Sequence, residues 1–219
     1  MIRMAQVLDT ATVKTLREAL DDPKTFADGR ATAGRAARAV KRNGQLARGP
    51  RHAVLAQAVE RALRDHALFR ICARPQAFVR LLFNRYGPGD AYGPHLDDPL
   101  IGQRRTDLSF TLFLSPPSTY DGGELVIEDQ DGETDVKLEA GDLVLYPTTR
   151  VHWVTPVTAG VRLACVGWVR SLIRLEAHRD ILFDLDRAAD TLFAAEGPGE
   201  TYRQIVRARD NLIRLWAED

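Results

Sequence analysis

Two histidines and one aspartate, in the segment His95-Leu96-Asp97 and at His152, have the residue types and spacing of metal ligands. Two imidazoles and one carboxylate can hold a non-haem Fe(II) ion on one face and leave the opposite face open to co-substrate and oxygen. Side chains two residues apart in an extended strand project from the same face, so one strand would deliver His95 and Asp97 together into a barrel. The β-rich stretch around His152 can supply the third ligand. The set predicts oxidative chemistry at iron rather than metal storage.

Arg162 follows in a segment that we expect to be a strand over residues 161–169, with Arg162, Ala164, Val166 and Trp168 on one face. A guanidinium among inward-facing residues needs an anionic partner, and its fork of donors fits a carboxylate. We interpret the far carboxylate of 2-oxoglutarate as that partner. Arg162 could instead lie on the surface of an edge strand, but the apolar residues around it favour burial.

The other histidines and both cysteines are expected to have structural roles. His52, His66 and His178 lie in segments with helical patterning, where a solvated or core-edge imidazole is the usual case. Cys72 and Cys165 lack a neighbouring Cys or His at the spacing of a zinc site, so we expect buried free thiols.

Composition bounds the class of protein. The 219 residues are 45% hydrophobic, which is ample for a folded core, and 30 basic and 30 acidic side chains give a formal net charge of zero. That balance provides no general attraction to nucleic acid or to an anionic membrane. The first residues lack the apolar run of a signal peptide, and no stretch of about 18 uncharged apolar residues occurs. We expect a cytoplasmic protein with neither nucleic-acid nor membrane partners.

Short strands flanked by helices are predicted along the chain. The expected helices are 7–22, starting at Asp9 or Thr10, then 35–43 and 51–67, and after the sheet 172–183 and 202–216. The expected strands are 78–86, 108–114, 123–128, 136–138 and 142–146, with the sheet beginning near 69–72. Short strands separated by Gly- and Asp-rich turns predict a β-sandwich or jelly roll. We divide the chain into an N-terminal helical region packed on the core (1–70), a β core (71–171) and a C-terminal helical extension (172–219).

Several features leave alternatives open. The basic residues of 35–43 could form a solvated helix face or could contact an acidic substrate near the site. Asp107 and Ser109 share the parity of Thr111, but alternation alone does not decide whether they face the site or solvent, so they stay outside the catalytic set. Gly122-Gly123 is expected to be a turn with positive φ. The apolar face of the last helix is expected to pack on the core, with another subunit as the alternative.

In addition to the spacing of these residues, several segments of the sequence resemble those of the bacterial PKHD-type hydroxylases. This family is a branch of the prolyl-4-hydroxylase-like Fe(II)/2-oxoglutarate dioxygenases. The similar segments are 28–34, 84–86, 92–97, 111–115, 120–125 and 140–147, followed by the segments of His152 and Arg162. The resemblance covers nearly the whole chain. Departures at Asp98-Pro99 and at Arg170 bear on substrate fit and leave the iron ligands intact.

The resemblance implies an α+β fold with a double-stranded β-helix (jelly-roll) core and flanking helices. It implies iron bound by His95, Asp97 and His152, and 2-oxoglutarate anchored by Arg162. It also implies a tyrosine that holds the co-substrate. Tyr86 is the first candidate and Tyr92 the second, while core packing is the alternative for either ring.

The implied activity is hydroxylation of an unactivated C–H bond of a peptide, amino-acid or small-molecule substrate, with O2 consumed and 2-oxoglutarate decarboxylated to succinate. L-ascorbate is a candidate auxiliary cofactor, a homodimer is a weak expectation, and a link to iron homeostasis is a hypothesis. A non-catalytic sensor that binds iron and 2-oxoglutarate is the main alternative. A cupin-like enzyme that uses iron without 2-oxoglutarate is a third possibility.

Overall fold

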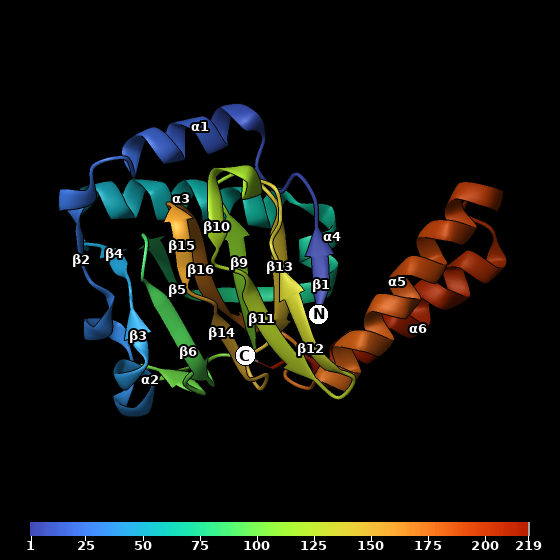
Figure 1. The fold of residues 1–219 in the computed structure, drawn as a ribbon. Coiled ribbons are helices and arrows are strands. Elements are labelled where there is room, and N and C mark those ends of the chain that lie inside the picture. The colour runs from blue at the N-terminus through green and yellow to red at the C-terminus, as the bar shows by residue number, and fades with distance from the viewer. Residues whose placement is uncertain (219) are drawn as a thin grey trace.

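Two antiparallel sheets face each other and form a double-stranded β-helix in the computed structural model, which describes residues 1–218 (Figure 1). Among these residues the larger sheet has seven strands, in the spatial order β1 (Ile2–Met4), β13 (Leu143–Pro147), β9 (Leu108–Phe113), β16 (Arg162–Ser171), β5 (Pro75–Tyr86), β4 (Gly44–Leu46) and β2 (Phe26–Asp28). The smaller sheet has the order β12 (Gly132–Val136), β11 (Leu125–Asp129), β14 (His152–Val154), β6 (Ala91–His95) and β3 (Lys41–Arg42). Two short ribbons pair β10 (Tyr120–Gly122) with β15 (Val157–Gly160), and β7 (Leu100–Ile101) with β8 (Arg104–Arg105). The fold is the predicted α+β jelly roll.

Helices cover the outer face of the larger sheet. They are α1 (Thr10–Ala19), α3 (Pro50–Asp65) and α4 (Ala67–Ala73), and a shorter helix, α2 (Arg35–Ala39), lies at the edge near β3. Helix α1 begins where the sequence predicts, because Asp9 Oδ1 accepts a hydrogen bond of 2.7 Å from the Thr12 amide. Single-turn 3₁₀ segments complete the connections, at Pro23–Thr25, Gly29–Thr32 and Pro117–Thr119.

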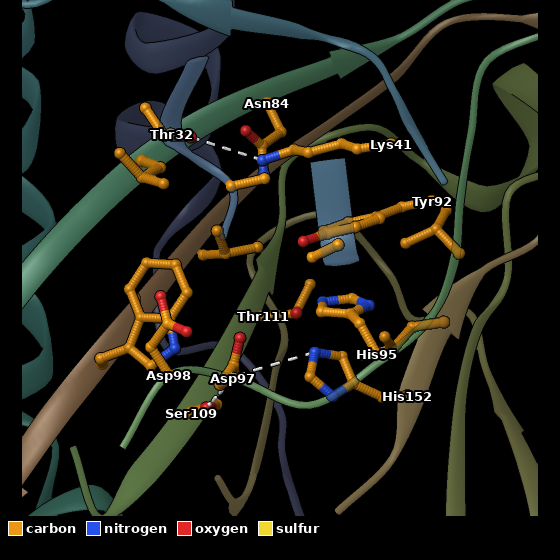
Figure 2. Close-up of a pocket in the computed structure, with 18 of the residues that line it drawn as sticks. Thr32, Lys41, Asn84, Tyr92, His95, Asp97, Asp98, Ser109, Thr111 and His152 are labelled. Atoms are coloured by element: carbon orange, nitrogen blue, oxygen red, sulfur yellow. Dashed lines mark hydrogen bonds and ion pairs between the residues drawn. The ribbon is translucent and has the colours of Figure 1, made fainter. Parts of the chain in front are cut away.

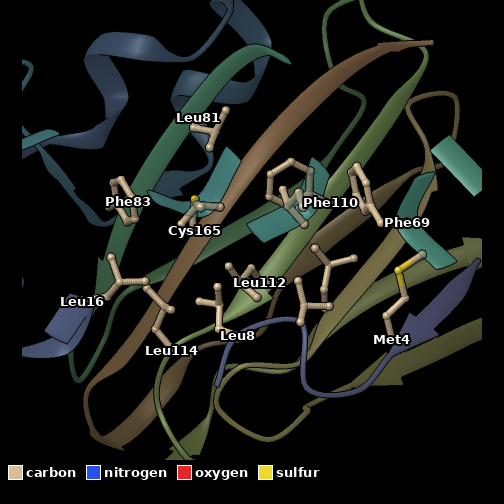
Figure 3. Close-up of a cluster of buried hydrophobic side chains, with 14 of the residues drawn as sticks. Met4, Leu8, Leu16, Phe69, Leu81, Phe83, Phe110, Leu112, Leu114 and Cys165 are labelled. Atoms are coloured by element: carbon tan, nitrogen blue, oxygen red, sulfur yellow. The ribbon is translucent and has the colours of Figure 1, made fainter. Parts of the chain in front are cut away.

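The central strand β9 shows how the core divides into two layers. Its side chains at 108, 110 and 112 belong to the outer cluster, which also contains Leu16 of α1 and Leu63 of α3. Figure 3 shows Phe110, Leu112 and Leu16 in this cluster. Phe113 belongs to the cluster between the two sheets. Because successive side chains of a strand alternate, polar Ser109 and Thr111 point between the sheets although every residue of β9 is buried.

Several expected boundaries are wrong. The strand expected at 136–138 lies at Gly132–Val136 (β12), and the helix expected to begin at residue 172 begins at Glu176. Residues 69–72 are helical, since α4 runs to Ala73 and only then does β5 begin; Phe69 stacks on Phe78 and meets Phe110 edge-on, which anchors the helix to the sheet. The expected helix 35–43 stops at Ala39, and the chain then enters β3 to pair with β6. The N-terminal region also contributes β1 to β4, and these short strands cover edges of both sheets that would otherwise expose unpaired backbone groups.

The C-terminal helices α5 (Glu176–Glu196) and α6 (Glu200–Trp216) form a hairpin that projects from the sheets (Figure 1). The break between them at 197–199 is where the sequence predicts it. The expected packing of α6 on the core is wrong: α6 lies against α5, where Trp216 stacks on His178 at 3.9 Å between ring centres, and Leu215 remains 76% exposed. No described helix is long and apolar enough to cross a membrane.

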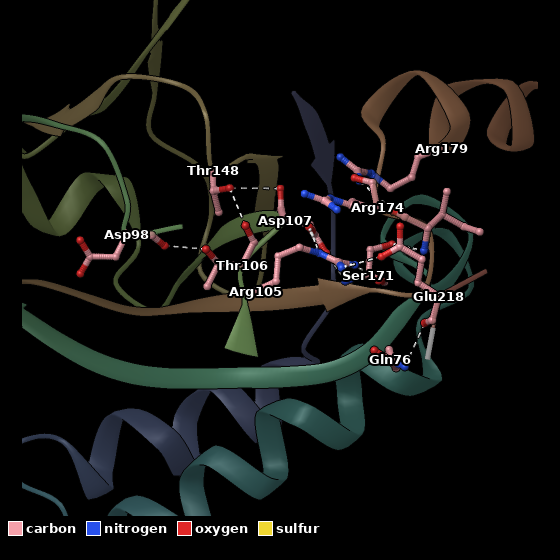
Figure 4. A network of polar contacts seen from close by, with 11 residues as sticks. Gln76, Asp98, Arg105, Thr106, Asp107, Thr148, Ser171, Arg174, Arg179 and Glu218 are labelled. Atoms are coloured by element: carbon pink, nitrogen blue, oxygen red, sulfur yellow. Dashed lines mark hydrogen bonds and ion pairs between the residues drawn. The ribbon is translucent and has the colours of Figure 1, made fainter. Parts of the chain in front are cut away.

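A polar network fastens the base of this hairpin to the sheet (Figure 4). Asp107 accepts hydrogen bonds from Arg105 Nε at 2.7 Å and from the Ser171 amide at 2.8 Å. Arg105 Nη1 in turn donates to Glu218 at 2.8 Å. Asp107 thus points away from the pocket described below, and its carboxylate, 6% exposed, joins the end of β16 to the loop before β9.

Replacing Asp107 by alanine should lower the free energy of unfolding by about 2–4 kcal/mol, because it leaves a buried amide and a partly buried guanidinium without their acceptor. Denaturant unfolding of the purified variant measures the change. Asp131→Ala, at an exposed turn, is the matched control and should stay within about 0.5 kcal/mol of wild type. Equal effects of the two substitutions would contradict a structural role for the network.

Candidate active site

A pocket between the two sheets contains the side chains that the sequence predicts for the site (Figure 2). Strands β5, β9 and β16 form one wall, and β3, β6 and β14 form the other. The segment from Thr32 to Ala37 contributes to the rim. The pocket brings together Tyr86, Tyr92, His95, Asp97, His152 and Arg162, which is the complete predicted set.

The three predicted metal ligands converge on one point. His95 is the last residue of β6 and His152 is the first of β14, and the two are directly paired in register. One ligand atom from each of His95, Asp97 and His152 lies within 4.8 Å of the other two. His152 Nε2 is 3.7 Å from Asp97 Oδ2. Two nitrogens and one carboxylate oxygen at this separation can share a single ion.

Both imidazoles are oriented for ligation by their backbone contacts. His95 Nδ1 lies 2.9 Å from the Gly93 carbonyl, and His152 Nδ1 lies 3.0 Å from the Arg150 carbonyl. A carbonyl only accepts, so each Nδ1 carries the proton and each Nε2 keeps its lone pair free for a metal ion. Burial, reinforced by the neighbouring His152, lowers the pKa of His95 to about 4. The ring of His95 is therefore neutral, as a ligand must be.

Asp97 lies beyond the strand that was expected to carry it. Strand β6 ends at His95 because its partner β14 begins at His152, and the residues before His152 form a turn. The alternation nevertheless continues for two residues, since Leu96 is 55% exposed and Asp97 points inward. The prediction of a common direction for His95 and Asp97 is confirmed, and the prediction of a common strand is wrong.

Ser109 holds the Asp97 carboxylate and was missed from the sequence. Its hydroxyl donates a hydrogen bond of 2.6 Å to Asp97 Oδ2, and the residue is 2% exposed. Alternation along β9 alone does not show which way Ser109 points. Its pairing with a residue of β16 does show it. Ser109 is paired with Trp168, which shares the pocket-facing side of β16 with Arg162.

Arg162 is the largest fully buried side chain and is 1% exposed. Its guanidinium carbon lies 5.3 Å from the centre of the Tyr86 ring and 5.4 Å from that of Phe113. Within residues 1–218 its Nε and Nη2 have no hydrogen-bond partner, and it forms no ion pair. A buried cation with free donors is costly unless an anion joins it. These residues therefore fit a carboxylate ligand such as 2-oxoglutarate beside the metal ligands.

The glycine pair before β11 makes room for this arginine. Gly123 has φ +67°, as predicted, and a Cβ there would lie 3.0 Å from Arg162 Cδ and 2.9 Å from Val157 Cγ2. A side chain at this position would displace the guanidinium stem. The turn thus has a second function besides its backbone geometry.

The two candidate tyrosines lie on different sides of the pocket. Tyr86 is paired in register with Arg162 and is 2% exposed, and burial raises its pKa to about 12. Tyr92 stacks on His95 with 3.7 Å between ring centres, and burial raises its pKa as well. A third tyrosine, Tyr146, lies edge-on to His152 at 5.1 Å. The sequence did not distinguish Tyr146 from the core residues of its strand.

The remaining histidines lie outside this group, as predicted. His52 Nε2 contacts the Leu81 carbonyl at 3.0 Å, His66 caps α4, and His178 stacks on Trp216. Both cysteines are buried free thiols, also as predicted.

The basic segment 35–43 divides into two environments. Arg35, Arg38 and Arg42 are exposed, as a solvated face requires, but Lys41 is only 7% exposed and lines the pocket.

Comparison with known proteins identifies the family. Residues 81–170 match the 2OG-Fe(II) oxygenase superfamily. The chain is 50% identical to a PKHD-type hydroxylase of Maricaulis maris, with 100% of both chains covered, and 45% identical to one of Picosynechococcus sp., with 99% of both covered.

Solved structures agree on the fold. A Pseudomonas putida prolyl-4-hydroxylase is 25% identical with a TM-score of 0.56, over 78% of this chain and 91% of that one. A viral collagen prolyl hydroxylase from Paramecium Bursaria Chlorella virus-1, solved with 2OG, is 16% identical with a TM-score of 0.53, over 78% of this chain and 94% of that one. Since full-length relatives match at half identity, the chain belongs to the PKHD-type hydroxylases of the 2OG-Fe(II) oxygenase superfamily, enzymes that use Fe(II) and 2-oxoglutarate.

Proposed function

We propose that His95, Asp97 and His152 hold the catalytic Fe(II) and that Arg162 anchors the far carboxylate of 2-oxoglutarate. The enzyme then hydroxylates an unactivated C–H bond of a peptide, an amino acid or a small molecule, and 2-oxoglutarate is decarboxylated to succinate. One observation carries the proposal: three potential ligand atoms within 4.8 Å of one another share a pocket with a buried guanidinium that has free donors.

Bound iron, with 2-oxoglutarate and O2, supplies the oxidising chemistry that no side chain of the pocket can perform. The protein binds these groups, orients them and excludes water from them. Three protein ligands on one face leave the opposite face to the co-substrates. The Gly93 and Arg150 carbonyls fix the two imidazoles, and Ser109 fixes the carboxylate, so the ligand geometry exists before the ion arrives.

The pocket wall limits access of water to the reacting groups. Leu82, Val166 and Trp168 contribute apolar surface on the larger sheet. A dry wall strengthens the ion pair between Arg162 and a carboxylate and protects an oxidising centre from side reactions. Tyr86, next to Arg162 in register, is our candidate for a second contact to the same carboxylate, with Tyr92 as the alternative.

Some expectations remain proposals. We infer a catalytic core at 71–171 with flanking regions 1–70 and 172–219, a cytoplasmic location, and L-ascorbate as a candidate auxiliary cofactor. A homodimer is a further hypothesis, and a role in iron homeostasis is a hypothesis that follows from the resemblance. The sensor alternative predicts binding of iron and 2-oxoglutarate without turnover, so slow succinate formation by the aerobic enzyme would argue against it.

The first test is anaerobic titration of the Fe(II)-loaded protein with 2-oxoglutarate, followed through the weak visible charge-transfer band of the chelate. Arg162→Ala should raise the Kd for 2-oxoglutarate by about 30-fold or more, because it removes one partner of a buried charge pair. Fe(II) affinity should stay close to that of wild type. The exposed Arg187→Ala on α5 is the control and should titrate like wild type.

If wild type binds iron but no band forms at saturating 2-oxoglutarate, the assignment of this pocket is wrong. A band that survives Arg162→Ala unchanged would instead move the co-substrate anchor to another residue. Turnover that persists in that variant would favour the cupin-like alternative.

Ser109→Ala tests the support of the aspartate ligand. Loss of the hydroxyl that orients Asp97 should weaken Fe(II) binding by about 10- to 100-fold, measured by competition with a chromophoric chelator. Ser118→Ala, at an exposed position, should leave the affinity unchanged. Equal Fe(II) affinities of the two variants would show that Ser109 does not position the ligand.

A further inference from the structure

Lys41 is a buried cation in the pocket with no assigned role. It lies on β3, where its backbone is paired with that of Tyr92 on β6. The neighbouring basic side chains of the segment are exposed, whereas Lys41 is 7% exposed and lines the pocket. A lysine normally extends its ammonium into water, so burial of this one calls for a physical reason.

The surroundings of Lys41 Nζ do not neutralise its charge. Its contacts are the Thr32 hydroxyl at 3.5 Å and the face of the Tyr92 ring at 4.9 Å. Among residues 1–218 no carboxylate lies within 4 Å of it. Asp97 and Asp28 attract it from farther away, but burial outweighs them and lowers the pKa of Lys41 to about 8. Asp97 is already engaged by Ser109 and by the proposed metal site.

One more polar group is available beside this ammonium, because the Thr32 hydroxyl already donates to Gln45 Oε1 at 2.7 Å. Asn84 is 4% exposed, and its Oδ1 has no hydrogen-bond partner within the described part of the chain. Figure 2 shows Asn84 and Thr32 next to Lys41, on the opposite side of Tyr92 from His95. An ammonium and an amide at one point of a pocket form a site for an anion that carries a neighbouring hydrogen-bond donor.

The charges of the co-substrate do not account for both buried cations of the pocket, Lys41 and Arg162. When 2-oxoglutarate chelates iron, one carboxylate binds the metal and only one remains. Arg162 on the larger sheet, with its two free donors, is sufficient for that second carboxylate. Lys41 enters the pocket from the smaller sheet, and no carboxylate of 2-oxoglutarate remains to pair with its ammonium. A further anion must therefore come from another ligand.

We propose that Lys41, oriented by Thr32 and with Asn84 beside it, forms a second anion subsite, which binds a carboxylate of the primary substrate. The inference rests on the proposed function, because it assumes that Arg162 holds 2-oxoglutarate. Tyr92 lies between Lys41 and His95, so the bound carboxylate is separated from the reacting carbon by the thickness of a ring. The substrate class is thus a carboxylic acid that is oxidised several bonds away from its carboxylate.

A purely structural role explains the burial of the Lys41 ammonium less well than an anion subsite does. The ring of Tyr92 attracts the ammonium, but a cation–π contact is weaker than the hydration that a buried ammonium loses. A methionine of similar length would fill the same space without that cost. A structural lysine would also be indifferent to the charge of small ligands, and this difference provides the test.

The test uses the Fe(II)- and 2-oxoglutarate-loaded enzyme under anaerobic conditions, with hexanoate and hexanamide as probes and ligand-observed NMR as the readout. Saturating 2-oxoglutarate keeps the probes from Arg162. Wild type should bind hexanoate about 10-fold more tightly than hexanamide, since a charge-assisted contact is lost in the amide. Lys41→Met should abolish the preference, and Lys41→Arg should retain most of it. Arg42→Met is the matched control: its side chain is adjacent and exposed, and the preference should be unchanged.

The outcomes separate the inference from the proposed function. Equal binding of acid and amide to wild type overturns the subsite, and that comparison needs no variant should Lys41→Met fail to fold. A preference that survives in Lys41→Met overturns it as well. A tenfold loss of 2-oxoglutarate affinity in Lys41→Met assigns Lys41 to the co-substrate and contradicts the proposal. If wild type fails to bind 2-oxoglutarate at all, the proposed function fails before any probe is added, and the inference falls with it.

Discussion

The pairing of β6 with β14 is the constraint on which the rest of the site depends. Because His95 and His152 face each other across this ladder, their rings are held 4.3 Å apart between centres, with a ligand nitrogen of each within reach of one ion. A shift of register by one residue would send one imidazole to the opposite face of the sheet. The remaining ligand, the hydroxyl of Ser109 and the two aromatic neighbours are all placed relative to this pair.

The two sheets contribute different chemistry to the same pocket. The smaller sheet provides the histidines and the lysine, and the larger sheet provides Arg162, Tyr86 and Ser109. Burial makes each cation selective for anions. An unpaired cation between apolar walls gains far more binding free energy from an anion than an exposed cation does.

Much of the site could be predicted from sequence, because two histidines, an aspartate and an arginine at these spacings are typical of few sites besides an iron centre with an anionic co-substrate. Facing was harder. Ser109 and Lys41 were left open, because the direction of a side chain in a short strand depends on its register with strands distant in the chain. Strand β3 has only two residues, too few for any periodicity to appear. The same limit applied to 69–72, where contacts of Phe69 with the sheet decide in favour of a helix.

The hydrogen bond from Ser109 to Asp97 joins the larger sheet to the segment that follows β6 of the smaller sheet. On the assignment proposed above, the ion is fixed to the smaller sheet and the tail of 2-oxoglutarate to the larger one. Ligands that bind only the folded state stabilise it in proportion to the logarithm of their concentration. Filling the site would therefore add a link between the two sheets, and the bound groups would raise the free energy of unfolding as well as take part in the reaction.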